Sequence, residues 1–157
     1  MDNKDFSTLL DFVQQGGALS CLANVDQKDL DLLYRYAMQL MNYGDYQGAK
    51  RIFFLLMRLN QGNFEYVYAL ATCCQQLHEH EEAIFCFGRA GMNRLQDPRS
   101  PYFAGISYLA LGNRQYAEKS FRAALRVCRC LPAEQWPEVR KNANQQLAYL
   151  MGEMCRE

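Results

Sequence analysis

The sequence predicts an all-α fold of repeated helix pairs, on three observations: a repeat of fixed length, turn residues between the helices, and apolar spacings typical of helices. The chain has 157 residues and 50% of them are hydrophobic, which is enough for one domain with a buried core. Lys plus Arg and Asp plus Glu each number 17, so the formal net charge is zero. This balance argues against nucleic acid or an acidic membrane as the partner.

The repeat has a period of 34 residues, and three columns of the sequence share it. The columns are Ala49, Ala83 and Ala117; Phe53, Phe87 and Phe121; and Ala37, Ala71 and Gly105. The period is that of the tetratricopeptide repeat, in which each unit is a pair of antiparallel helices. Small residues let the two helices of a pair approach closely, and the phenylalanines fill the space between successive units. We therefore predict three tandem repeats, over residues 30–63, 64–97 and 98–131.

Turn residues place the helices within each unit. The predicted pairs are 30–43 with 46–60, 64–77 with 80–95, and 98–111 with 114–129. Gly44-Asp45 and Gly112-Asn113 mark the turn inside the first and third pairs, whereas the middle pair has His78 where the others have glycine. The run from Asp97 to Pro101 offers two overlapping helix starts, with Asp97 or Ser100 as the N-cap.

The two flanks are also predicted to be helical. A stack of repeats exposes apolar surface at both ends, so helices that cover those ends are expected. Residues 1–29 form the predicted N-terminal helical segment, and its apolar residues suggest a dimerisation surface: Phe6, Leu9, Leu10 and Val13. Residues 132–157 form the predicted C-terminal capping helix, which Pro137 begins and which carries one apolar stripe: Val139, Ala143, Leu147, Leu150 and Met154.

The composition favours a cytoplasmic setting over export. The N-terminal residues Met-Asp-Asn-Lys-Asp lack the apolar region of a secretory signal. The longest apolar run, Ile52 to Met57, is far shorter than the roughly 20 residues needed to span a bilayer. Seven cysteines, an odd number, are scattered through helical patterns and indicate reduced thiols.

The first helix of each pair carries a second stripe that the core columns leave free. It occupies the fifth, ninth and twelfth positions of the helix, which lie on one face. Tyrosine stands at the fifth position in all three units, and a tyrosine ring suits a surface that is wet when empty and filled when bound. Alternatively, individual tyrosines pack between the repeats. The predicted peptide-binding residues are Tyr34, Met38, Met41, Tyr68, Thr72, Gln75, Tyr102, Ile106 and Leu109.

Catalysis, metal binding and cofactors have no positive support in the sequence. Cys74 and His78 are spaced i, i+4 with Cys73 and His80 nearby, but neither a C-x-x-C pair nor an H-E-x-x-H motif is present. We interpret the two histidines as solvent-side turn residues and the cysteines as small core residues. We predict no catalytic residue, no metal site and no cofactor, and therefore not an enzyme.

Several short sequence segments between the repeat columns are not shared by tetratricopeptide repeats in general, so they indicate a family more specifically than the repeat does. Together they resemble the class II chaperones of type III secretion, the LcrH/SycD family, over nearly the whole chain. The segments are Gly16-Gly17-Ala18-Leu19, LYRYA from Leu33 to Ala37, Gly44-Asp45-Tyr46, YALATCCQ from Tyr68 to Gln75, and DPRSPY from Asp97 to Tyr102.

The resemblance implies a bacterial cytoplasmic chaperone for the hydrophobic translocator proteins that later form a pore in a host membrane. Such a chaperone holds a short Pro-x-Leu-x-x-Pro-like client segment in its concave groove and keeps the client soluble before export. The resemblance also implies a homodimer and, for some members, a transcriptional activator as a second partner. It implies client contact at the nine groove positions named above. The alternative is a general tetratricopeptide-repeat scaffold or adaptor in another protein assembly.

Overall fold

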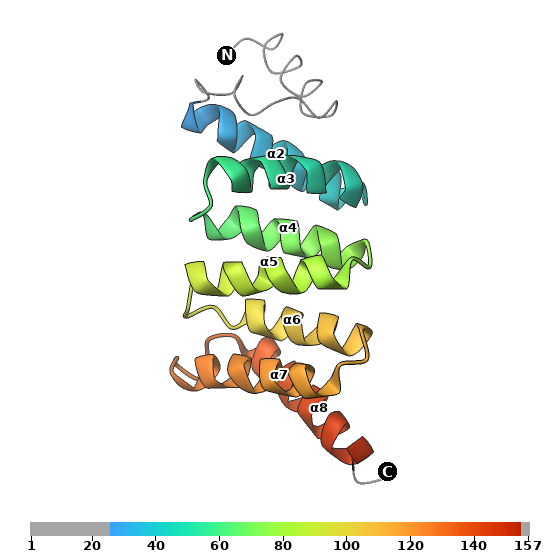
Figure 1. Ribbon diagram of the computed structural model, residues 1–157. Helices are drawn as coiled ribbons and strands as arrows, with labels where there is room; N and C mark the ends of the chain where they lie inside the picture. The colour runs from blue at the N-terminus through green and yellow to red at the C-terminus, as the bar shows by residue number, and fades with distance from the viewer. Residues whose placement is uncertain (1–25, 155–157) are drawn as a thin grey trace.

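The computed structural model describes residues 26–154, and all the regular secondary structure in that range is helical. Figure 1 shows the helices stacked in chain order, with the last one running obliquely at the C-terminal end. The predicted N-terminal stripe of Phe6, Leu9, Leu10 and Val13 lies outside the described residues. The helices are α2 (Gln27–Asn42), α3 (Tyr46–Leu59), α4 (Phe64–Gln76), α5 (His80–Asn93), α6 (Arg99–Ala110), α7 (Arg114–Arg129) and α8 (Pro137–Met154).

Helices α2 to α7 form the three predicted pairs, so the all-α repeat fold is confirmed. The largest difference in bounds is at α2, which begins at Gln27 and not at residue 30. The Asp29 carboxylate accepts the backbone N–H of Asp26 at 3.3 Å, which caps this earlier first turn. At α6, Asp97 Oδ1 accepts the backbone N–H of Arg99 at 3.0 Å. The N-cap of α6 is Pro98, however, so neither of the two predicted N-caps, Asp97 and Ser100, occupies that position.

The three repeating columns form the centre of the fold. Every alanine and phenylalanine of these columns is at most 1% exposed, and Gly105 is buried as well. Gly105 shows how little room remains, because a Cβ atom added there would lie 2.7 Å from Cε1 of Phe121. The helices of a pair thus meet at distances that only small residues permit.

The turn inside each pair has the same backbone shape in all three repeats. Gly44 and Gly112 have φ angles of 84° and 74°, and His78 has a φ of 60° at the equivalent place. The residue after each donates its N–H to the carbonyl five residues earlier, as in Glu79 to Cys74 at 2.9 Å. The absence of glycine in the middle repeat therefore leaves the turn unchanged and places a histidine in the left-handed region.

Helix α8 begins at Pro137, as predicted, and packs against α7. Ala143 and Leu150 are buried and share a cluster with Phe121 and Leu125 of α7. The Arg140 guanidinium also donates to the backbone carbonyl of Cys128 at 2.6 Å. The last helix thus covers the apolar end of the third repeat.

Gly105→Ala should destabilise the protein, because its Cβ meets the buried Phe121 ring. Overpacking should exceed the gain in helix propensity and lower the free energy of unfolding by about 1–2 kcal/mol. Gly88→Ala is the matched control, since a Cβ on that exposed helical residue has no neighbour within 4 Å. It should raise stability by about 0.5–1 kcal/mol. Equal urea midpoints for the two variants would contradict this account of the core.

His78→Gly should stabilise the middle turn. A left-handed backbone costs a non-glycine residue about 1–2 kcal/mol, and the greater freedom of glycine in the unfolded chain offsets part of the gain. We expect the free energy of unfolding to rise by about 0.5–1 kcal/mol. The reciprocal change, Gly112→Ala, meets no atom within 4 Å and should lower it through backbone strain alone. Thermal denaturation of both variants measures the two effects.

Candidate functional site

The predicted peptide-binding residues lie on α2, α4 and α6, the first helices of the three pairs. Eight of the nine are half-buried, as expected of side chains that line a surface groove. Tyr102 differs, because only 9% of it is exposed and it belongs to the cluster under α8. The structure therefore places Tyr102 with the core and leaves the other two repeating tyrosines accessible.

Each repeating tyrosine packs against the column phenylalanine of its own unit. The ring-to-ring distance is nearly the same in all three units, so the tyrosine and phenylalanine columns pack together in each repeat. The ring centroids are 5.8 Å apart for Tyr34 and Phe53, 5.7 Å for Tyr68 and Phe87, and 5.7 Å for Tyr102 and Phe121. The tyrosines thus have a structural role in addition to any contact with a ligand.

Tyr68 is the central tyrosine of the predicted groove. Its ring stacks on Phe64 at 5.3 Å and meets the edge of Phe103 at 6.4 Å, and the Arg99 guanidinium lies 4.7 Å from its centroid. Burial raises the pKa of the Tyr68 phenol to about 12. The phenol is therefore neutral at physiological pH and presents an O–H group.

An ion pair beside Tyr68 was missed by the sequence analysis. The Asp97 carboxylate is 2% exposed and accepts three hydrogen bonds from the Arg99 guanidinium: Nε to Oδ1 at 3.0 Å, Nε to Oδ2 at 3.2 Å and Nη2 to Oδ2 at 2.6 Å. The Arg99 guanidinium also lies 4.8 Å from the Trp136 ring, which precedes α8. Arg99 thereby joins the middle repeat, the start of α6 and the loop before α8.

Gln75 is already engaged within the fold. Its amide nitrogen donates to the Phe103 carbonyl at 2.9 Å and to Ser107 Oγ at 2.8 Å, so both amide hydrogens are used between α4 and α6. The amide carbonyl is what Gln75 can offer to a ligand. His80 Nδ1 lies 3.5 Å from the same Ser107 hydroxyl and the residue is half-buried. The interpretation of His80 as a solvent-side residue was therefore wrong, whereas His78 is exposed.

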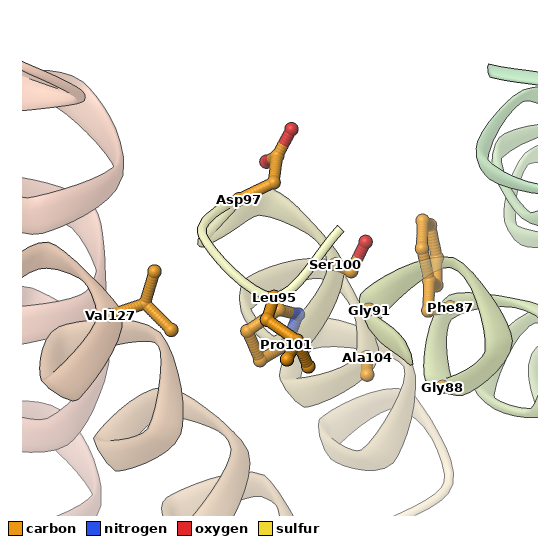
Figure 2. A pocket seen from close by; sticks show the side chains of 9 residues that line it. All are labelled: Phe87, Gly88, Gly91, Leu95, Asp97, Ser100, Pro101, Ala104 and Val127. Carbon is orange, nitrogen blue, oxygen red and sulfur yellow. The ribbon is translucent and has the colours of Figure 1, made fainter. Parts of the chain in front are cut away.

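A separate pocket of about 240 Å³ lies between α5, α6 and α7. Figure 2 shows the residues that line it, with Val127 of α7 on one side and Gly88 and Gly91 of α5 on the other. Ser100 contributes a fully buried hydroxyl that has no hydrogen-bond partner within the described part of the chain. None of the nine predicted peptide-binding residues lines this pocket.

Acidic and thiol groups gather at the turn of the middle repeat, where a metal had been considered. Cys74, Glu79 and Glu82 bring one Sγ and two carboxylate oxygens within 4.8 Å of one another. The Lys50 ammonium donates to both carboxylates, to Glu82 at 2.8 Å. Burial lowers the pKa of Lys50, but these hydrogen bonds raise it more, so the pKa lies above its usual value. We interpret the cluster as an ion-pair network centred on Lys50.

Across residues 26–154, every helix is too short or too polar to cross a lipid bilayer. The helix that comes nearest in length, α8, carries several charged and amide side chains along its faces.

The chain is similar in sequence and in fold to proteins of type III secretion systems. No family model matches the chain. The Low calcium response locus protein H of Yersinia pestis is 24% identical over 118 residues, which cover 74% of this chain and 70% of that protein. A type III secretion complex from Aeromonas hydrophila contains a chain that is 27% identical, with a TM-score of 0.80 over 96% of this chain and 99% of that one. The resemblance to the LcrH/SycD family is confirmed.

Further solved structures describe what such relatives bind. PcrH from Pseudomonas aeruginosa is 25% identical, with a TM-score of 0.75 over 83% of this chain and 97% of its own. PcrH has also been solved with the chaperone-binding regions of PopD and of PopB. SycD from Yersinia enterocolitica, described as a type III secretion translocator chaperone, shares the fold at 20% identity.

Arg99→Met should destabilise the fold, because it removes the guanidinium that is hydrogen-bonded to the buried Asp97 carboxylate and leaves only Arg94, whose Nη1 lies 3.9 Å from Asp97 Oδ2. We expect the free energy of unfolding to fall by about 2–4 kcal/mol. Arg122→Met is the control, since Arg122 is 54% exposed and pairs only with Glu118 one helical turn away among the interactions described. Its effect should stay below about 1 kcal/mol. Equal losses in chemical denaturation would show that the Arg99 pair acts as a surface pair.

Proposed function

We propose that this protein is a bacterial cytoplasmic chaperone that binds the hydrophobic translocator proteins of a type III secretion system and keeps them soluble before export. The observation that carries the proposal is the similarity to PcrH, which has been solved with the chaperone-binding regions of two proteins, PopD and PopB. The role requires binding free energy and no covalent chemistry, so the protein is proposed not to be an enzyme.

The proposed client site runs along α2, α4 and α6. Its accessible residues combine aromatic faces at Tyr34 and Tyr68 with flexible or branched aliphatic side chains such as Met38 and Ile106. These groups suit a client segment that is extended and carries spaced apolar anchors. Prolines in such a segment lower the entropy lost on binding, because they restrict it before it docks.

The nine proposed contact residues divide into three roles. Tyr102 is buried, so it acts as support for the third repeat and not as a direct contact. Gln75 acts through its carbonyl, since its amide hydrogens are used within the fold. The remaining residues offer side-chain surface to the client: Tyr34, Met38, Met41, Tyr68, Thr72, Ile106 and Leu109.

Two further partners belong to the proposal. The apolar stripe of Phe6, Leu9, Leu10 and Val13 is proposed to mediate homodimerisation, in keeping with the dimer described for SycD. A transcriptional activator is the second proposed partner, which would bind when clients have left.

The direct test is recovery of the client from the bacterium itself. The full chain, tagged at its C-terminus, should co-purify with proteins that carry long apolar segments and are exported by the secretion system. Co-expression should then keep such a client in the soluble fraction, whereas the client alone aggregates. Recovery of only water-soluble assembly proteins would favour the general scaffold instead.

Thr72→Glu should weaken binding of a peptide from the recovered client. It places a carboxylate between Tyr68 and Gln75 on the groove face of α4, where a bound peptide would remove it from water. We expect the affinity to fall at least about tenfold, with a change in stability below about 1 kcal/mol. Gln47→Glu adds the same charge to an exposed position on α3 and should leave binding unchanged. Calorimetric titration of both variants decides the site, and unchanged affinity in a folded Thr72→Glu protein would refute it.

A further inference from the structure

Two buried cysteines of the middle repeat lie on the two helices of the pair. Cys74 lies near the end of α4 and Cys86 lies in α5, and they are 1% and 7% exposed. Both thiols line one pocket, and each shifts the pKa of the other. Cys73 is also buried, but it immediately precedes Cys74 in α4 and therefore lies on a different face of the helix. Within residues 26–154, Cys74 and Cys86 are therefore two buried thiols that share one pocket.

Small molecules can reach this pair through a surface pocket. A pocket of about 380 Å³ lies between α3, α4 and α5, and both thiols line it. Phe54 and Phe85, which are 53% and 63% exposed, also line it. Cys73 does not line this pocket. The other lining residues are Lys50, Met57, Leu70, Glu81 and Glu82.

The charged groups around the pair give the two sulfurs different roles. The interaction between the two thiols lowers the pKa of Cys86, whereas the same interaction together with burial raises the pKa of Cys74. The Lys50 ammonium adds a positive charge that favours thiolate at both positions. The Glu82 carboxylate lies 3.9 Å from Cys74 Sγ and can take its proton. Cys86 is therefore the better nucleophile, and Cys74 is placed to react second.

We propose that Cys86 and Cys74 form a peroxide-reactive dithiol site that closes to a disulfide between α4 and α5. The Cys86 thiolate attacks one oxygen of hydrogen peroxide, the O–O bond breaks, and hydroxide leaves as Cys86 sulfenic acid forms. Cys74 then attacks the sulfenic sulfur, the S–S bond forms and hydroxide leaves. The protons of the two thiols, the second by way of Glu82, convert both hydroxides to water. Peroxide is reduced and two thiols are oxidised, so two waters are produced.

A disulfide at this site would restrain α4, which is one of the helices of the proposed client site. Helix α4 also carries Tyr68, Thr72 and Gln75, and it packs closely on α5. A disulfide at Cys74 would fix the end of α4 to the middle of α5. The chemistry itself does not depend on the proposed function, because it requires only the two thiols and their pocket.

The test uses the reduced full-length protein and hydrogen peroxide. After exposure, remaining thiols are alkylated and the protein is cut after glutamate, which separates Cys74 from Cys86 at Glu79, Glu81 and Glu82. Mass spectrometry should find the two resulting peptides joined by a disulfide in monomeric protein. A chain in which this pair stays reduced while the exposed Cys130 is oxidised would overturn the proposal.

Single variants separate the two roles. Cys74→Ala should stop the disulfide and leave a Cys86 sulfenic acid that a cyclic 1,3-diketone traps, whereas Cys86→Ala should abolish trapping in this segment. Cys73→Ala is the matched control, because Cys73 is equally buried but does not line the pocket, and burial raises its pKa to about 12. It should form the disulfide at a rate within about twofold of the parent protein. Circular dichroism establishes that each variant is folded, and a disulfide from Cys73 to Cys86 would contradict the assignment.

Discussion

The close approach of the two helices in each pair is the constraint on which the rest of the structure depends. At Gly105 the neighbouring Phe121 ring leaves no space for even one methyl group. The ring is therefore held in one position, and it supports a tyrosine of the first helix from behind. The same stack of small residue, phenylalanine and tyrosine recurs in each unit, so the surface of α2, α4 and α6 is set by contacts in the core.

The sequence was informative where its chemistry repeats and silent where a contact occurs once. The 34-residue columns located the helices, the close-approach residues and the face on which Tyr34 and Tyr68 are accessible. Arg99 and Asp97 were not recognised as a buried ion pair, because the burial of Asp97 depends on how α6 meets the middle repeat. Tyr102 has the same register as the other tyrosines, but α8 and its cluster cover the third repeat, which periodicity could not reveal.

The middle repeat departs most from the shared pattern. It contains His78 in a left-handed turn, the network of Lys50 with two glutamates, and the Cys74 and Cys86 pair. Lys50 comes from the preceding repeat, so this network ties α3 to the turn between α4 and α5. His78 and the Lys50 network lie at the turn between α4 and α5, and Cys86 lies farther along α5. The Tyr68 ring is near the start of α4, away from that turn. The middle unit thus combines the shared groove chemistry with polar contacts of its own.

The linear stacking of the helices has a consequence for how the protein holds together. From α2 to α7, each helix packs chiefly on the helices before and after it in the chain, so the cohesion of the molecule passes from neighbour to neighbour. Such an array loosens most easily at its ends, because a terminal unit has one neighbour where an inner unit has two. A ligand laid along α2, α4 and α6 would touch all three units at once. It would stabilise the array against local unfolding, and the outer units would be stabilised the most.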